Sequence, residues 1–70
     1  MFLSWNDLTE AEKIQAEISF LCILEEMASN GDEYDVADYE MTRDDRPFRL
    51  HRLQYKSFIR DKDGYIFVNI

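Results

Sequence analysis

The sequence contains few of the residues that mark secreted, membrane-spanning or multidomain proteins. Its 70 residues include one cysteine, one proline and two glycines. Because the lone Cys22 cannot form an internal disulfide, the chain needs no oxidising compartment, and we expect a cytoplasmic protein. The longest apolar run, residues 18–24, is interrupted by Ser19 and is much shorter than the roughly 20 residues of a membrane span. We therefore expect no membrane segment.

The scarcity of glycine and proline also leaves no flexible linker, so we predict a single domain over residues 1–70. A chain of this length buries only about 60% of its unfolded surface, and its stability is expected to be small. The hydrophobic content of 46%, with five Phe, four Tyr and one Trp, is nevertheless sufficient for a compact core.

Groups that could carry out catalysis or hold a metal are almost absent. His51 is the only side chain that would titrate near neutral pH, and Cys22 lies in the apolar arc of a predicted helix, where a buried, unreactive thiol is expected. One Cys and one His cannot form a zinc site within one chain. Residues 61–64 (DKDG) resemble the start of a calcium loop, but no bidentate acid follows about eleven residues later. We expect no enzyme, no metal and no cofactor.

Charge is divided unevenly along the chain, which has a net charge of -7. Residues 1–42 contain eleven acids and only one base, Lys13. Residues 43–70 contain seven bases and four acids. Such asymmetry indicates either that the basic segment binds a phosphate backbone or that the two halves of the chain pack together and neutralise each other.

A long N-terminal helix is predicted over residues 10–29. Thr9 and Glu12 form the pattern of a capping box, and Gly31 can take the left-handed conformation that ends a helix. The apolar arc becomes wide from Ile18 onward, as expected of a helix that is covered on more than one side. Ile14 and Ile18 lie on one helical stripe of this arc. We expect residues 1–5, which include Trp5, to pack back on the domain or on a partner.

Two further segments are open to more than one interpretation. Residues 32–41 fit a short helix with Asp32 as its N-cap, or a strand with Tyr34 and Val36 on one face; the broken alternation favours the helix. Residues 42–47 are predicted to form a turn in which Asp44 or Asp45 caps the next element. Residues 48–56 then form either a helix, with Arg49, Arg52 and Lys56 on the solvent face, or a strand.

A β-hairpin is predicted at the C-terminus. The Asp61–Gly64 segment forms a tight turn between residues 57–60 and 65–70, with Gly64 at the position that needs positive φ. If Ile59 faces Ile66, then Ser57 faces Val68 and Tyr55 faces Ile70. The predicted class is α+β, with a long N-terminal helix, one or two short helices and this hairpin; the alternative is an αβββ or ααββ miniature domain.

Four stretches together resemble a winged helix-turn-helix domain: ILEEMA (23–28), YDVADY (34–39), LHRL (50–53) and FIRDKDGYIF (58–67). The resemblance covers residues 18–70. It implies a first helix packed across two shorter ones, a basic recognition helix that contacts double-stranded DNA, and a hairpin wing. The basic positions would then supply the phosphate and base contacts of a DNA-binding regulator. These candidate nucleic-acid-binding residues are Arg43, Arg46, Arg49, His51, Arg52, Lys56, Arg60 and Lys62.

An alternative function follows from the acidic half of the chain. Its carboxylates would suit a host or regulatory protein with a basic surface, as in a phage- or plasmid-type inhibitor that in some cases mimics nucleic-acid phosphates. The wide apolar arc of the first helix also suggests a homodimer, in which a second copy covers the exposed part.

Overall fold

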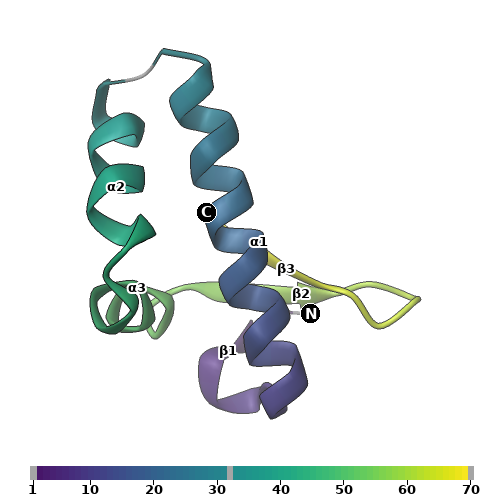
Figure 1. The fold of residues 1–70 in the computed structure, drawn as a ribbon. Coiled ribbons are helices and arrows are strands. Elements are labelled where there is room, and N and C mark those ends of the chain that lie inside the picture. Colours follow the sequence, from purple (N-terminus) through teal and green to yellow (C-terminus); the bar gives the residue numbers. More distant parts are fainter. Residues whose placement is uncertain (1, 32, 70) are drawn as a thin grey trace.

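The computed structural model describes residues 2–31 and 33–69, without the side chains of residues 34 and 35. The elements follow in the order β1 (Leu3–Ser4), the 3-10 turn η1 (Trp5–Asp7), α1 (Glu10–Ser29), α2 (Glu33–Arg43), α3 (Arg46–Leu53), β2 (Ser57–Arg60) and β3 (Ile66–Asn69) (Figure 1). This order confirms the predicted α+β class. The helix at residues 46–53 excludes the αβββ alternative. Within the described residues, no helix has the length and apolar character needed to cross a membrane.

Helix α1 has the predicted bounds, and its ends have the predicted chemistry. The Thr9 backbone N–H donates to Glu12 Oε1 at 3.0 Å, and the Glu12 N–H donates to Thr9 Oγ1 at 3.2 Å. These reciprocal bonds satisfy two of the backbone donors that the first turn leaves free. At the other end, Gly31 has a φ of 88°, which glycine adopts without the steric strain of a Cβ atom.

Helices α1 and α2 run antiparallel, and α3 crosses beneath the end of α2 (Figure 1). The preference for a helix over residues 32–41 is confirmed, although the predicted cap Asp32 lies outside the described residues. The prediction that Thr42 and Arg43 belong to a turn is wrong. Thr42 is fully buried in the last turn of α2, where its Oγ1 donates to the Asp38 carbonyl at 2.9 Å. Only Asp44 and Asp45 separate the two helices.

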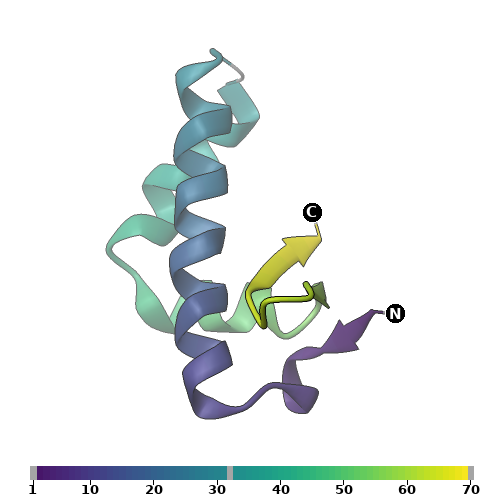
Figure 2. The same ribbon diagram turned by 90° about the vertical axis from the view of Figure 1, so that its right-hand side faces the viewer.

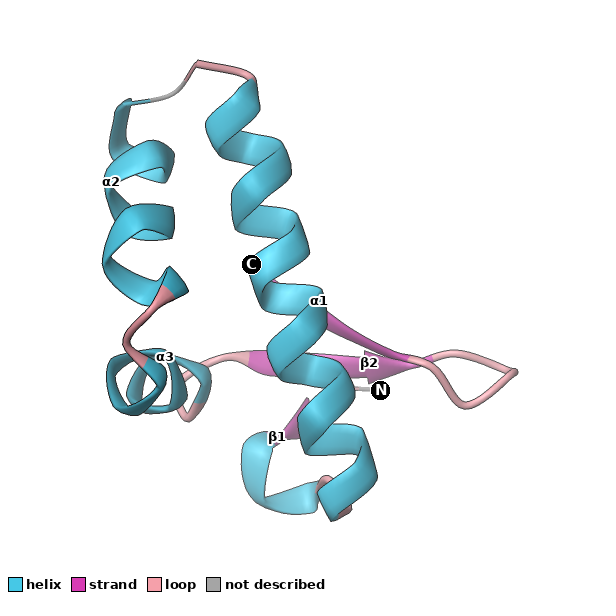
Figure 3. Ribbon diagram, in the orientation of Figure 1, coloured by secondary structure: helices cyan, strands magenta, loops and turns pink. Residues whose placement is uncertain are grey.

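Three antiparallel strands form one sheet in the order β1-β2-β3 (Figure 3). The short strand β1 was not predicted; it pairs Leu3 with Phe58 and Ser4 with Ser57. The predicted hairpin is present, and Gly64 has a φ of 86° as its turn position requires. The glycine prediction for this turn is therefore confirmed.

The predicted register of the hairpin is wrong by one residue. Ile59 lies opposite Phe67 rather than Ile66, and Ser57 lies opposite Asn69 rather than Val68. The reason is that the Asp61 N–H donates to the Tyr65 carbonyl at 3.0 Å, which leaves a three-residue loop ending at Gly64 instead of a two-residue loop. Tyr55 lies outside β2, and its predicted partner Ile70 lies outside the described residues.

A one-residue shift exchanges the two faces of a strand. Phe58, Ile66 and Val68 therefore point into the core, whereas Ile59 and Phe67 point away from it. The core is enclosed by α1, α3 and the inner face of the sheet, which lies beside α1 in Figure 2, and Tyr39 of α2 packs against it. Its buried side chains are those of Leu8, Ala16, Phe20, Leu24, Leu53, Phe58, Ile66 and Val68.

Candidate interaction surface

Arg49 is buried between the three helices. The prediction that it shares a solvent face of α3 with Arg52 and Lys56 is wrong, because it is only 8% exposed. Its Nη1 donates to the Thr42 carbonyl at 2.6 Å and to the Arg43 carbonyl at 3.3 Å. These carbonyls belong to the last turn of α2, where no further helical N–H can reach them. Arg49 thus caps α2 from the neighbouring helix.

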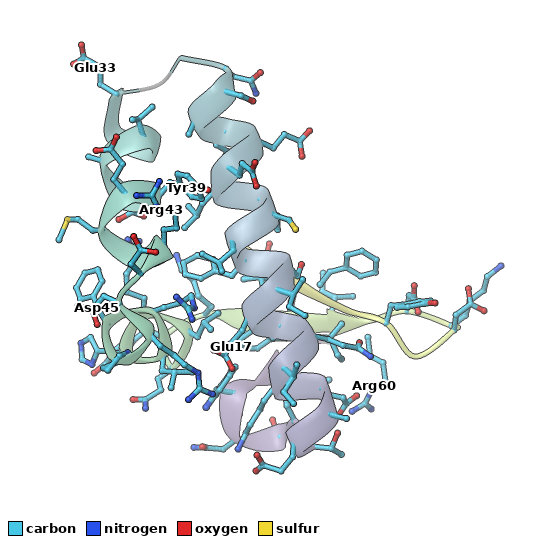
Figure 4. The ribbon with its side chains drawn as sticks, in the orientation of Figure 1. Glu17, Glu33, Tyr39, Arg43, Asp45 and Arg60 are labelled. Carbon is cyan, nitrogen blue, oxygen red and sulfur yellow. The ribbon has the colours of Figure 1, made fainter. Side chains whose placement is uncertain are left out.

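Glu17 of α1 binds two arginines of α3. Its carboxylate accepts from Arg46 Nε at 3.0 Å and from Arg46 Nη2 at 3.1 Å, a bidentate pair, and Arg49 Nη2 lies 3.6 Å away. The Glu17 side chain is 12% exposed and lies between α1 and α3 (Figure 4). The Glu17 carboxylate raises the pKa of Arg46. Both arginines are therefore used to attach α3 to α1.

Arg52 makes the corresponding link between α3 and α2. Its guanidinium forms an ion pair with Asp38, and its Cζ lies 5.9 Å from the centre of the Phe20 ring. The Asp38 side chain is largely shielded from solvent by this contact. Arg52 is half-buried rather than presented to a ligand.

Arg60 joins the hairpin to the start of α1. Its Nε and Nη2 donate to Glu12 Oε2 and Oε1 at 2.7 and 2.9 Å (Figure 4). The bonds from Arg60, followed by the backbone bond from Thr9, lower the pKa of Glu12 to about 2 from its ordinary value of 4.5. The Glu12 carboxylate in turn raises the pKa of Arg60. This pair spans 48 residues of sequence.

Three of the eight predicted nucleic-acid-binding residues form no ion pair with a described side chain. They are His51, Lys56 and Lys62. His51 is exposed on α3, and its ring lies edge-on to that of Tyr55 at 5.3 Å. Lys62 is exposed in the hairpin turn, whereas Lys56 is half-buried just before β2. Arg43, the remaining candidate, is exposed and pairs locally with Asp44 at 3.3 Å, beside the Tyr39 ring (Figure 4). The structure therefore does not gather the eight residues into one free basic face.

Acidic side chains remain over much of the described surface. Glu25 and Glu26 are exposed near the end of α1, and Glu33 and Glu40 are exposed on α2. Asp7 accepts bonds from the Ser4 N–H and Oγ–H, which lower its pKa and keep it ionised. The exposed acids are therefore spread over several elements. Glu25 and Glu26 lie on the same helix as an exposed apolar surface, which includes Ile14 and Ile18.

That apolar surface includes residues from the predicted apolar arc of α1. Ile14 and Ile18 are 58% and 59% exposed, because the inward face of α1 is the row of Ala16, Phe20 and Leu24 instead. Cys22 is also exposed, contrary to the prediction of a buried thiol. The sequence did contain a signal for this, since the apolar arc of α1 is wider than one covering layer requires.

A groove of about 290 Å³ lies between α1 and β3. Ile18 and Phe67 are its exposed apolar side chains from the two elements, joined by Tyr65 from the hairpin turn. The complete lining consists of Gln15, Ile18, Ser19, Tyr65, Ile66 and Phe67. We take this groove as the candidate interaction surface.

Comparison of the chain with protein-family models, with curated proteins and with solved structures gives no match in any of the three. Among the described residues, no three His, Cys, Asp or Glu side chains are grouped so that they could hold a metal ion.

Proposed function

We propose that this chain is a small non-enzymatic binding protein that engages a partner protein with a basic surface. The observation that carries the proposal is that six of its eight basic side chains form ion pairs with its own acids. A ligand phosphate could recruit these six side chains only by displacing the carboxylates that already hold them, several of which are shielded from solvent. Such displacement would also loosen the contacts between α3 and the other helices.

The charges left over are mainly negative. Lys56 and Lys62 are the bases without an ion pair among the described side chains. The described acids without one are Asp7, Glu25, Glu26, Glu33, Glu40, Asp45, Asp61 and Asp63. A surface of this sign attracts cationic partners and repels phosphates. An inhibitor of the phage or plasmid type, including one that mimics nucleic-acid phosphates, would use the same carboxylates.

Charge reversal at the end of α1 tests this proposal. We expect immobilised protein to retain a specific partner from extracts of the cells that produce it, and Glu25→Lys/Glu26→Lys to abolish that retention. The matched control is Glu33→Lys/Glu40→Lys, which changes the net charge equally on α2 and should retain the partner. Quantitative mass spectrometry of the bound fractions measures the difference. Failure of the unchanged protein to retain any partner would contradict the proposal.

A second candidate function is DNA binding by a winged-helix-type domain. Three helices followed by an antiparallel hairpin support it, as does the position of His51, Lys56 and Lys62 along the path from α3 to the hairpin turn. If this candidate is correct, affinity for duplex DNA should fall steeply as salt rises, because phosphate contacts release counterions. Lys56→Ala/Lys62→Ala should weaken binding, whereas Lys13→Ala, whose lysine pairs with Glu10, should not. Absence of duplex binding at about 50 mM salt would exclude it.

A further inference from the structure

The outer face of the sheet is apolar next to the hairpin turn, although Ser57 and Asn69 make its other end polar. An antiparallel sheet that covers a core on one face normally presents polar side chains on the other. Here Ile59 and Phe67 lie directly opposite each other on the outer face and are 39% and 50% exposed. Tyr65, two residues before Phe67, is exposed as well. Cross-strand neighbours of this kind are close enough to form one continuous patch.

The patch continues onto α1 across the groove. Ile18 lines the groove, Ile14 lies one helical turn before it, and the exposed Cys22 lies one turn after it. Contiguous exposed apolar surface on two elements is characteristic of a site that another molecule covers. The surface thus extends from one face of α1 to the outer face of the hairpin.

The edge of β3 in this groove is already partly occupied. Gln15 Oε1 of α1 accepts a hydrogen bond from the Ile66 N–H at 3.4 Å. A partner strand would need that N–H to extend the sheet, so Gln15 opposes strand addition. The groove is better suited to side chains projecting from a helix, which need no backbone partner.

The charges around the groove define the partner further. Glu25 and Glu26 follow Ile18 and Ser19 by seven residues, so they lie on the same rows of α1, about 10 Å beyond the groove. At the hairpin turn, Asp61 and Asp63 precede Tyr65, accompanied by Lys62. A second copy of this chain would bring another net charge of -7 to this acidic rim. A cationic partner is favoured by the same charges.

We infer that the groove between α1 and β3 docks an amphipathic helix with a basic polar face, supplied by a partner protein. The inference rests on the proposed function and specifies where and how that partner binds. Apolar side chains of the partner helix cover Ile18 and Phe67, and its lysines or arginines lie against Glu25 and Glu26. This arrangement is the helix-in-groove mode of peptide recognition.

A synthetic peptide tests the inference directly. The probe is an amphipathic helix of about 18 residues in which Leu recurs every three or four positions among Lys residues. Titration at about 150 mM salt, followed by two-dimensional amide NMR, should shift residues 14–22 and 65–69 most. A peptide of the same composition with Leu and Lys scrambled should bind at least about 10-fold more weakly, because it cannot present one apolar face.

Variants separate the groove from general charge attraction. Ile18→Ser and Phe67→Ser should each weaken peptide binding about 10-fold, since each removes exposed apolar surface that binding would cover. Tyr55→Ser is the matched control: it removes a side chain that is 77% exposed but lies outside the groove, and binding should be unchanged. Circular dichroism melting checks that all three variants remain folded.

Three results would overturn the inference that the groove docks a basic amphipathic helix. They are shifts spread over all exposed acids, equal binding of the scrambled peptide, and a dimer in sedimentation that Ile18→Ser/Phe67→Ser converts to a monomer. The proposed function is tested independently of the groove.

If a cellular partner requires Glu25 and Glu26 but still binds Ile18→Ser/Phe67→Ser, the proposed function holds and the groove is excluded as the docking site. Failure to retain any cellular partner would contradict the function even where the peptide occupies the groove.

Discussion

Arg49 of α3 is buried and contacts both of the other helices. A charged group removed from water must be compensated by ion pairs and hydrogen bonds, or its burial opposes folding. Here the compensation comes from the Glu17 carboxylate and from two carbonyls at the end of α2. Arg49 Nε has no partner among the described residues. The planar, multiply donating guanidinium can serve both α1 and α2 at once, which a lysine ammonium cannot do with the same geometry.

We predict that Arg49→Ala lowers the free energy of unfolding by about 2 kcal/mol, because it leaves the Thr42 and Arg43 carbonyls without their donor. Glu17 keeps its bidentate pair with Arg46 in this variant. Arg49→Lys should recover only part of the loss. Arg43→Ala, which removes an exposed arginine from the same region, should change stability much less, because surface ion pairs contribute little. Urea unfolding followed by circular dichroism measures all three. Equal effects of Arg49→Ala and Arg43→Ala would contradict this account.

The sequence could not distinguish these arginines. Four arginines recur every three residues, at positions 43, 46, 49 and 52. This spacing predicts the same solvent exposure for each of them. The difference comes from Glu17, which lies 29 residues before Arg46 in sequence and meets α3 only after folding. The opposite charges of the two halves did indicate that such pairs were available, but not which residues would form them.

At the scale of elements, α3 illustrates how tertiary contacts resolve an ambiguous segment. Residues 48–56 fitted both a helix and a strand, and the helix forms with Asp45 at its N-cap. Asp45 Oδ1 accepts from the Phe48 N–H at 3.1 Å, and Pro47 lies in the first turn, where its missing N–H costs no helical bond. Leu53 then completes the core.

We predict that Asp45→Ala lowers the free energy of unfolding by about 1 kcal/mol, through loss of the cap. Asp44→Ala is the matched control, since it removes a neighbouring acid that does not cap α3; its effect should stay below about 0.5 kcal/mol. Asp45→Ser should retain most of the stability because its hydroxyl can accept the same bond. Thermal unfolding of the three variants measures these changes. A larger loss of stability in Asp44→Ala than in Asp45→Ala would show that Asp45 is not the cap.

The hairpin shows a different limit of sequence reasoning. Its existence and the role of Gly64 were predictable, because DKDG between two apolar runs is typical of a tight hairpin turn. Its register was not, since a two-residue and a three-residue loop both place Gly64 in the turn. The Asp61 N–H bond to Tyr65 selects the longer loop and thereby exposes Ile59 and Phe67. The candidate docking surface follows from this one-residue difference.

For the molecule as a whole, the acidic first half and the basic last third are complementary parts of one fold. Arg46 and Arg49 attach α3 to α1, Arg52 attaches it to α2, and Arg60 attaches the hairpin to α1. The charge asymmetry is therefore used largely within the chain. The surplus acids on the outside, together with the exposed apolar surface, are what remain for a partner.

The Glu12–Arg60 pair makes this long-range attachment sensitive to acid. In the folded protein the pKa of Glu12 is about 2, below its ordinary value of 4.5, so the unfolded chain binds the proton more readily. The contribution of the pair to stability is therefore complete above about pH 4.5 and is lost as pH falls towards about 2. We predict that Arg60→Ala raises the pKa of Glu12 towards 4.5 and makes stability less dependent on pH across this window. The Thr9 N–H bond keeps part of the lowering of the Glu12 pKa in that variant.

NMR titration of the Glu12 carboxyl carbon measures the pKa, and acid unfolding measures the stability. As a control, Arg46→Ala removes the pair with Glu17 and should leave the pKa of Glu12 unchanged. If the pKa of Glu12 in Arg60→Ala equals that in the unchanged protein, Arg60 does not hold this carboxylate.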